Sequence, residues 1–284
     1  MIAAGRLDDR LIGDALGRLP GARFDRWIEE GDAADLHVEG DPADVRAALS
    51  ALDRVDVAIQ AEPRVVPRLF VADMDSTMIG QECIDELADF AGFKAEVAAV
   101  TERAMRGEID FAQALAERVA CLEGLNATLI GQCLATRIHP TAGAAALVAT
   151  LKERGVLTVL VSGGFEDFVY PIGARLGFDR MHANRLSATG GRLSGTTEGP
   201  IVDSASKRRF AEEALSEIGA GADALVAVGD GANDIPMIEL AGLGLGYRPK
   251  PALEVAADGV IRHHDLTAVL WMLGIPRREW LISP

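Results

Sequence analysis

Two aspartates separated by one residue stand at the end of a short apolar run. In LFVADMDSTMI, residues 69–79, Asp73 and Asp75 follow four apolar residues, and Thr77 comes two positions later. Two carboxylates held in one small volume repel each other unless a cation or a shared proton compensates. A carboxylate beside a metal can act as a nucleophile while its neighbour carries a proton. The motif therefore indicates metal-assisted chemistry, although the aspartates could equally cap a turn, with Thr77 capping a helix.

A second group of polar residues follows another apolar run. Ser162, Gly163 and Gly164 come directly after LTVLV, residues 157–161. A hydroxyl and two glycines between a strand and a helix present backbone N–H groups to an anion, but the same residues also make ordinary tight turns. Farther along, Lys207 lies near the start of a helix predicted over residues 204–218. A lysine in a first turn opposes the helix dipole, so we expect an anionic partner, the alternative being a solvated surface lysine.

The third group is GDGAND, residues 229–234, which follows the apolar run ALVAV. It supplies Asp230, Asn233 and Asp234, and the glycines beside Asp230 let the backbone approach a ligand closely. Carboxylate oxygens from Asp230 and Asp73 would suit Mg²⁺, which uses few protein ligands and leaves room for water and phosphate. The five histidines and three cysteines are scattered and show no metal-ligand or redox spacing, so we interpret them as structural or exposed.

The elements that must position these residues form an α/β pattern. The runs at 69–72, 157–161 and 224–228 are short and apolar throughout, which is typical of parallel strands buried on both faces. Because active groups of such sheets lie at the carboxyl ends of the strands, the three polar groups should meet at one edge. Residues 80–137 contain four helical patterns and no convincing strand. This insertion should lie over the same edge as a helical cap.

Residues 1–66 have a different pattern and form a small domain followed by a linker. Helices are predicted at 9–19 and 41–52, and strands at 22–28, 34–38 and 55–59. A strand stub at 1–4 would complete a βαββαβ unit that resembles the ACT domain, which regulates or dimerises many amino-acid enzymes, although a purely structural role is equally open. The proline-bounded segment 61–67 is the predicted linker, and residues 67–284 form the predicted core.

Composition narrows the class of partners. The chain has 284 residues, of which 49% are hydrophobic and 25% charged, with a net charge of −15. This acidic balance argues against a nucleic-acid or anionic-membrane surface and favours small-molecule partners. The N-terminal region has no apolar signal segment, and no run reaches membrane-spanning length, so a cytoplasmic protein is expected.

The motifs in this order resemble those of the haloacid dehalogenase superfamily of phosphotransferases. DMDST, the Ser-Gly-Gly strand end, Lys207 and GDGAND match its four signature motifs. Within this superfamily the sequence resembles the phosphoserine phosphatase family over about residues 68–275. The resemblance includes four positions in the cap, which are Glu82, Met105, Phe111 and Arg118. It implies a Rossmann-like parallel sheet with a helical cap insertion, preceded by the small ACT-like domain.

The resemblance also implies a role for each residue. Asp73 would be the nucleophile that forms an aspartyl-phosphate, and Asp75 the general acid and base. Mg²⁺ would be held by Asp73, the backbone carbonyl of Asp75 and Asp230. Phosphate oxygens would be bound by a further set of groups, namely Ser162, Gly163, Gly164, Lys207 and Asn233. Thr77 and Asp234 would support the site from behind.

In the cap, the resemblance implies that Glu82 pairs with the substrate ammonium and Arg118 with its carboxylate. Met105 and Phe111 would exclude water, their alternative being ordinary helix packing. The implied reaction is hydrolysis of O-phosphoserine to serine and phosphate, the last step of serine biosynthesis, and the ACT-like unit leaves a homodimer open. Two other functions are kept, which are a superfamily phosphatase or phosphotransferase acting on another small phosphate ester, and a non-enzymatic amino-acid-binding regulator.

Overall fold

The large sheet is mostly parallel and places the DMDST strand at its centre. The computed structural model describes residues 1–106 and 108–281, apart from the side chain of Met105. Strand β5 (Leu69–Ala72) lies between β6 (Leu157–Phe165) and β9 (Leu225–Gly229), parallel to both. The order of the eight strands is β4-β11-β10-β9-β5-β6-β7-β8. The other strands are β4 (Val57–Ala58), β7 (Arg180–Thr189), β8 (Arg192–Glu198), β10 (Leu243–Tyr247) and β11 (Gly259–Ile261). This confirms the predicted α/β fold class.

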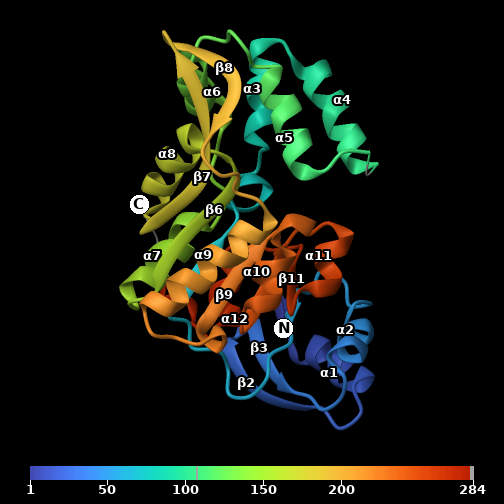
Figure 1. Cartoon of the computed structure of the whole chain (residues 1–284). Coiled ribbons are helices and arrows are strands. Elements are labelled where there is room, and N and C mark those ends of the chain that lie inside the picture. The colour runs from blue at the N-terminus through green and yellow to red at the C-terminus, as the bar shows by residue number, and fades with distance from the viewer. Residues whose placement is uncertain (107, 282–284) are drawn as a thin grey trace.

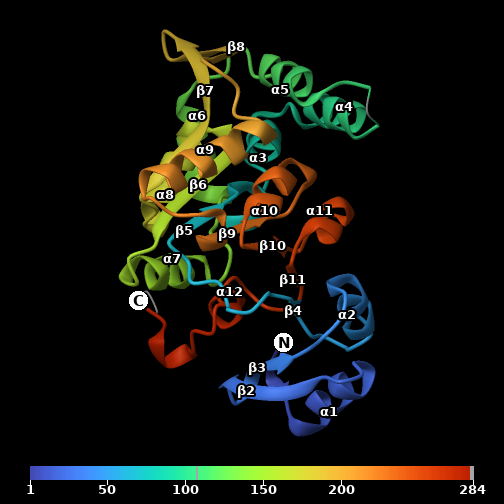
Figure 2. The same cartoon turned by 60° about the horizontal axis from the view of Figure 1, so that its bottom comes forward.

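Helices cover both faces of this sheet (Figures 1 and 2). Successive residues of β5 point to opposite faces, so Phe70 packs in one apolar cluster and Val71 in another. The cluster around Phe70 includes residues of six helices, among them α7 (Ala144–Glu153), α8 (Glu166–Leu176) and α12 (Ala268–Met272). The cluster around Val71 includes residues of α9 (Ser204–Glu217), α10 (Ile235–Leu240) and α11 (Pro251–Ala256). Burial on both faces explains why the central strands are apolar throughout.

Four helices form a separate layer at one end of the molecule, next to the β7–β8 hairpin (Figure 1). They are α3 (Cys83–Ala91), α4 (Lys94–Met105), α5 (Phe111–Ala120) and α6 (Thr128–Arg137). Helix α5 starts with a capping box, in which Asp110 accepts from the Gln113 N–H at 2.8 Å. The hairpin joins this layer through backbone hydrogen bonds, among them Gly124 N–H to the Leu193 carbonyl at 2.8 Å. The hairpin thereby fixes the helical insertion relative to the sheet.

The N-terminal residues form a small antiparallel sheet with the order β1-β3-β2. Its elements are β1 (Ile2–Leu7), α1 (Asp9–Arg18), β2 (Arg23–Glu29), β3 (Gly31–His37) and α2 (Pro42–Leu49). The first strand, expected as a four-residue stub, has six residues. The last expected strand of the unit, 55–59, contacts this sheet only through a bridge between Asp56 and Ile2, and its β4 part pairs antiparallel with β11 of the large sheet. Figure 2 shows the small sheet and its helices at one end of the molecule, and Ile2 and Ala33 of this sheet pack in the apolar cluster around Phe70.

A buried aspartate just before β4 connects the two parts. Asp56 exchanges two backbone hydrogen bonds with Ile2, at 2.8 and 2.9 Å, while its carboxylate accepts the backbone N–H groups of residues 262–264. His264 Nδ1 lies 2.7 Å from the same carboxylate, and its Nε2 accepts the Ala4 N–H at 2.9 Å. His264 is therefore a packing residue between the two parts.

Among the described residues, none of the helices combines the length and the hydropathy that a membrane span requires.

Candidate active site

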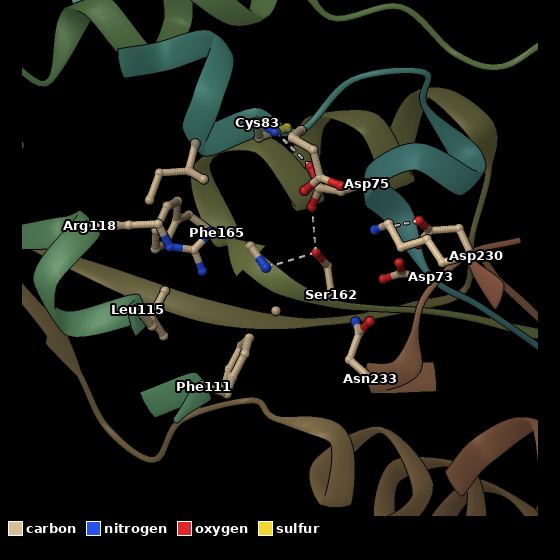
Figure 3. A pocket seen from close by; sticks show the side chains of 15 residues that line it. Asp73, Asp75, Cys83, Phe111, Leu115, Arg118, Ser162, Phe165, Asp230 and Asn233 are labelled. Carbon is tan, nitrogen blue, oxygen red and sulfur yellow. Dashed lines mark hydrogen bonds and ion pairs between the residues drawn. The ribbon is translucent and has the colours of Figure 1, made fainter. Parts of the chain in front are cut away.

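The polar ends of β5, β6 and β9 meet in one cavity of about 210 Å³ beneath the helical layer (Figure 3). Ten predicted site residues line it, which are Asp73, Asp75, Glu82, Phe111, Arg118, Ser162, Gly163, Gly164, Asp230 and Asn233. The cavity is smaller than the roughly 300–1,000 Å³ that drug-sized ligands occupy. It fits a small metabolite. Lys207, Asp234 and Thr77 are buried behind this lining.

Asp73 is held by a buried ion-paired triad. Lys207 Nζ lies 2.5 Å from Asp73 Oδ1 and 2.7 Å from Asp234 Oδ1, and all three side chains are almost fully buried. The other Asp234 oxygen accepts the backbone N–H groups of Asp230 and Gly231, both at 3.1 Å. Gly229 has to lack a side chain, because a Cβ there would lie 2.5 Å from the Asp234 carboxyl carbon. Asp234 thus fixes both Lys207 and the loop that carries Asp230.

Burial and the neighbouring Asp234 carboxylate raise the pKa of Asp73, whereas the Lys207 ammonium lowers it. Burial by itself would lower the pKa of Lys207, but the charges of Asp234 and Asp73 raise it above its ordinary value. The lysine therefore remains an ammonium ion in the interior. Asp73 and Asp234 are thus the anionic partners expected for Lys207 in the first turn of its helix.

Asp75 lies opposite Asp73 and is fixed by two donors (Figure 3). Its Oδ1 accepts the Cys83 backbone N–H at 2.8 Å, and its Oδ2 accepts the Ser162 hydroxyl at 3.0 Å. Ser162 Oγ in turn accepts the Gly164 N–H at 2.9 Å. Burial raises the pKa of Asp75. A carboxyl with a raised pKa that faces the cavity can hold a proton and deliver it.

The Ser-Gly-Gly loop is shaped by close contacts. A Cβ on Gly164 would lie 2.9 Å from Asp75 Oδ2, and one on Gly163 would lie 3.1 Å from Phe111 Cζ. The Gly163 carbonyl accepts the Asn184 side-chain amide at 2.8 Å, and Asn184 Oδ1 accepts the Val202 N–H at 2.8 Å. Asn184 is a buried positioning residue in β7 that the sequence did not indicate, because no motif marks it.

Glu82 and Arg118 face the cavity from the helical layer. Glu82 Oε1 accepts the Ser76 hydroxyl at 2.9 Å, and Ser76 adopts the left-handed backbone region with φ of 56°. Burial and the charge of Asp75 raise the pKa of Glu82 to about 7. Arg118 Nε donates to the Ala114 carbonyl at 3.2 Å. Among the described residues, no carboxylate lies within 4.0 Å of the Arg118 guanidinium, which is therefore free to pair with an anionic ligand.

The remaining predicted residues are Phe111 and Met105 of the helical layer and Thr77 of the DMDST motif. Phe111 lines the cavity and is 37% exposed, so it closes one side of the opening. Met105 lies at the end of α4, and its side chain is outside the described part of the structure. Thr77 is fully buried, and its hydroxyl has no hydrogen-bond partner in the described residues.

The residues around Asp73 fit a hard divalent cation. One carboxylate oxygen each from Asp73, Asp230 and Asp234 lie within 4.8 Å of one another. A cationic group already contacts this set, since Lys250 Nζ lies 2.9 Å from Asp230 Oδ2. The sequence did not indicate Lys250, because the strand and turn that carry it have no signature motif. A set made only of carboxylate oxygens suits Mg²⁺ better than softer metals.

Comparisons with known proteins agree with this site. Phosphoserine phosphatase SerB2 of Mycobacterium tuberculosis is 42% identical over 233 residues, which cover 81% of this chain and 57% of that protein. A phosphoserine phosphatase of Archaeoglobus fulgidus is 43% identical over 241 residues, which cover 83% of this chain and 70% of that protein. Thus the chain spans little more than half the length of the mycobacterial relative.

A solved structure described as a phospho-aspartyl intermediate analogue of phosphoserine phosphatase aligns with a TM-score of 0.66 and 37% identity. The alignment covers 72% of this chain and 98% of that one. The sequence profile of a family described as haloacid dehalogenase-like hydrolase matches residues 70–239, which include the ends of all three site strands. Together with the shared fold and the identities above, this match shows that the chain belongs to the haloacid dehalogenase-like hydrolase family.

Proposed function

We propose that this chain is a magnesium-dependent phosphoserine phosphatase, which hydrolyses O-phosphoserine to serine and phosphate. One observation carries the substrate assignment. Glu82 and the Arg118 guanidinium, which has no carboxylate partner among the described residues, face the same small cavity as Asp73 and Asp75. A free amino acid offers an ammonium and a carboxylate, and each is costly to bury unless it meets an opposite charge. The two relatives described above are named phosphoserine phosphatases.

In the first half-reaction, an Asp73 carboxylate oxygen attacks phosphorus in line with the serine oxygen. The new bond joins Asp73 to phosphorus, and the bond from phosphorus to the serine oxygen breaks. The departing oxygen takes the proton of Asp75, whose raised pKa favours the protonated form needed at this point. Serine leaves, and Asp73 carries the phosphoryl group as an acyl phosphate.

In the second half-reaction, Asp75 is ionised and takes a proton from a water molecule. That water attacks phosphorus, the bond from phosphorus to the Asp73 oxygen breaks, the Asp73 carboxylate is regenerated, and inorganic phosphate is released. Asp75 then holds a proton again and is ready for the next substrate. The Cys83 N–H keeps Asp75 Oδ1 in place through both halves.

The negative charge on the transferring group needs several fixed donors. Lys207, Ser162, the N–H groups of Gly163 and Gly164, and Asn233 would hold the phosphate oxygens. Lys207 is suited to this because two carboxylates fix it in the interior, so no reorganisation is needed during the reaction. The Asn184 side-chain amide, which donates to the Gly163 carbonyl, fixes the peptide that carries the Gly164 N–H.

The site residues fit Mg²⁺ held by Asp73, Asp230 and the backbone carbonyl of Asp75. Asp234 is close enough to be a ligand, but its oxygens already accept from Lys207 and from two backbone N–H groups. We therefore assign it to positioning Lys207. When bound, Mg²⁺ would supply positive charge that offsets the repulsion between the nucleophile and the phosphate dianion.

The cap would select the substrate. Glu82 would accept from the serine ammonium, and the charge of that ammonium would lower the raised pKa of Glu82. Arg118 would bind the serine carboxylate through two parallel hydrogen bonds. Phe111, against Gly163, would shield the reacting groups from water, and Met105 is assigned the same role.

Phosphate release from a panel of phosphorylated amino acids and sugars, with and without Mg²⁺, tests the proposal. Phosphoserine should be hydrolysed with the highest kcat/KM, and EDTA should abolish its turnover. Preference for a sugar phosphate would replace the substrate assignment with another small phosphate ester. Absence of turnover on every compound, with serine still bound, would favour the regulator. The homodimer also stays a prediction, and light scattering on the purified chain measures it.

A further inference from the structure

Lys250 is placed beside Asp230 by the backbone as well as by its side chain. The Lys250 N–H donates to the Asp230 carbonyl at 2.8 Å, and its Nζ lies 2.9 Å from Asp230 Oδ2. Lys250 directly precedes α11, whose first residue is Pro251. The β10–α11 connection thus fixes the Lys250 backbone next to the β9 strand end, and the ammonium contacts the carboxylate assigned to Mg²⁺.

The exposure of this pair is unequal. The Asp230 side chain is 8% exposed, whereas the Lys250 side chain is 58% exposed. The lysine side chain can therefore leave the carboxylate for solvent. Lys207 cannot move in this way, since its side chain is 1% exposed and is bound to two carboxylates. Lys207 is therefore fixed in its position, whereas the Lys250 side chain has room to exchange between the carboxylate and solvent.

An ammonium and a divalent cation on the same carboxylate repel each other at the short distances that both require. A cation bound by Asp73 and Asp230 would displace the Lys250 ammonium from Asp230 Oδ2. The side chain has a second carboxylate within electrostatic reach, because Glu82 lines the same cavity and Lys250 opposes the rise in the Glu82 pKa. The displaced ammonium would therefore stay near the cavity.

We infer that Lys250 is an exchangeable counter-ion that occupies Asp230 when the site holds no divalent cation and leaves it when the cation binds. This inference rests on the proposed function for the place of the metal. The Lys250–Asp230 pair lowers the affinity for Mg²⁺, because the pair has to break each time the cation binds. When no Mg²⁺ is bound, the Lys250 ammonium compensates the charge of the buried Asp230 carboxylate.

Calorimetric titration of Mg²⁺ into the whole chain tests the inference. Lys250→Met should bind Mg²⁺ about 3- to 10-fold more tightly than the parent, the range expected for removing a competing, partly exposed ion pair. Lys250→Arg keeps the charge and should not tighten binding. Lys152→Met is the matched control, because Lys152 pairs with Asp179 at 2.7 Å on a helix outside the site. Its Mg²⁺ affinity should equal that of the parent.

Unchanged or weaker Mg²⁺ binding by Lys250→Met would overturn the inference, as would a parent chain that binds no Mg²⁺. Thermal unfolding adds a second readout. In EDTA the variant should melt below the parent, since Asp230 has lost its partner, and saturating Mg²⁺ should remove the difference. Equal melting in EDTA would contradict the counter-ion role. Neither measurement needs turnover, so tighter Mg²⁺ binding without phosphoserine hydrolysis would refute the proposed function and leave this inference standing.

Discussion

Replacing Lys207 by Met removes the only ammonium bound to the buried Asp73 and Asp234 carboxylates among the described residues. The methionine fills similar space, so the main change is in charge. The oxygens of Asp73, Asp230 and Asp234 then lie within 4.8 Å of one another, with the exposed Lys250 as the remaining cation on this set. We expect a large loss of stability in the metal-free chain.

The size of this loss follows from the distances. Two unit charges 4.8 Å apart repel by about 3.5 kcal/mol at an effective dielectric constant of about 20. Uptake of a proton by Asp73 limits the total, so we expect a loss of about 3–5 kcal/mol, the range found when one partner of a buried pair is removed. For a chain of this size that corresponds to a fall of roughly 6–20 °C in Tm. Saturating Mg²⁺ should recover part of it.

The loss should depend on pH. The pKa of Asp73 is already raised above its ordinary value of 3.8, and removing Lys207 raises it further. Between the ordinary and the raised pKa, the folded chain binds more protons than the unfolded chain, so the free energy of unfolding falls as pH rises. The difference between parent and variant should therefore be smallest near pH 4 and grow toward neutral pH.

Thermal unfolding in EDTA at several pH values measures this difference. Lys152→Met, which breaks a partly exposed ion pair, should lose no more than about 1 kcal/mol. A Lys207→Met chain as stable as the parent at pH 7, or a loss that is equal at pH 4 and pH 7, would refute the proposed charge balance of the triad.

Three further changes test the reacting groups and the cap. Arg118→Ala should lower kcat/KM for phosphoserine by roughly 100-fold while p-nitrophenyl phosphate hydrolysis changes little, and an equal loss on both substrates would contradict carboxylate binding. Gly164→Ala places a Cβ 2.9 Å from Asp75 Oδ2, so kcat should fall by about 100-fold with the fold retained by circular dichroism, and near-parent turnover would contradict the tight packing of Asp75. Ca²⁺ should inhibit the Mg²⁺-loaded chain, because its higher coordination number would engage both Asp73 oxygens, and full activity in Ca²⁺ would count against Asp73 as nucleophile.

The central part of the site was predictable because local patterns specify it. Apolar runs ending in Asp73, Ser162 and Asp230 mark buried parallel strands, and parallel strands bring their carboxyl ends to one edge. The lysine in the first turn of α9 indicated an anionic partner, which the structure supplies as Asp73 and Asp234. These inferences need only strand direction and charge.

Other features depend on contacts between distant segments. Asn184 supports Gly163 from a neighbouring strand, and Lys250 reaches Asp230 from the β10–α11 connection. Strand β4 joins the large sheet by pairing with β11, and the paired residues Val57 and Val260 are roughly 200 positions apart in the chain. Neither side-chain type nor periodicity indicates such pairings, so they became visible only in the folded chain.

The most direct test of the account is to identify the residue that carries phosphate during turnover. The Mg²⁺-loaded chain, mixed with ³²P-labelled phosphoserine and quenched in acid within milliseconds, should retain a label that is stable to acid and released by hydroxylamine. Borohydride reduction and peptide mapping should place this acyl phosphate on Asp73, and Asp73→Asn should take up no label. Label on a serine or histidine, or a labelled Asp73→Asn chain, would contradict the proposed mechanism.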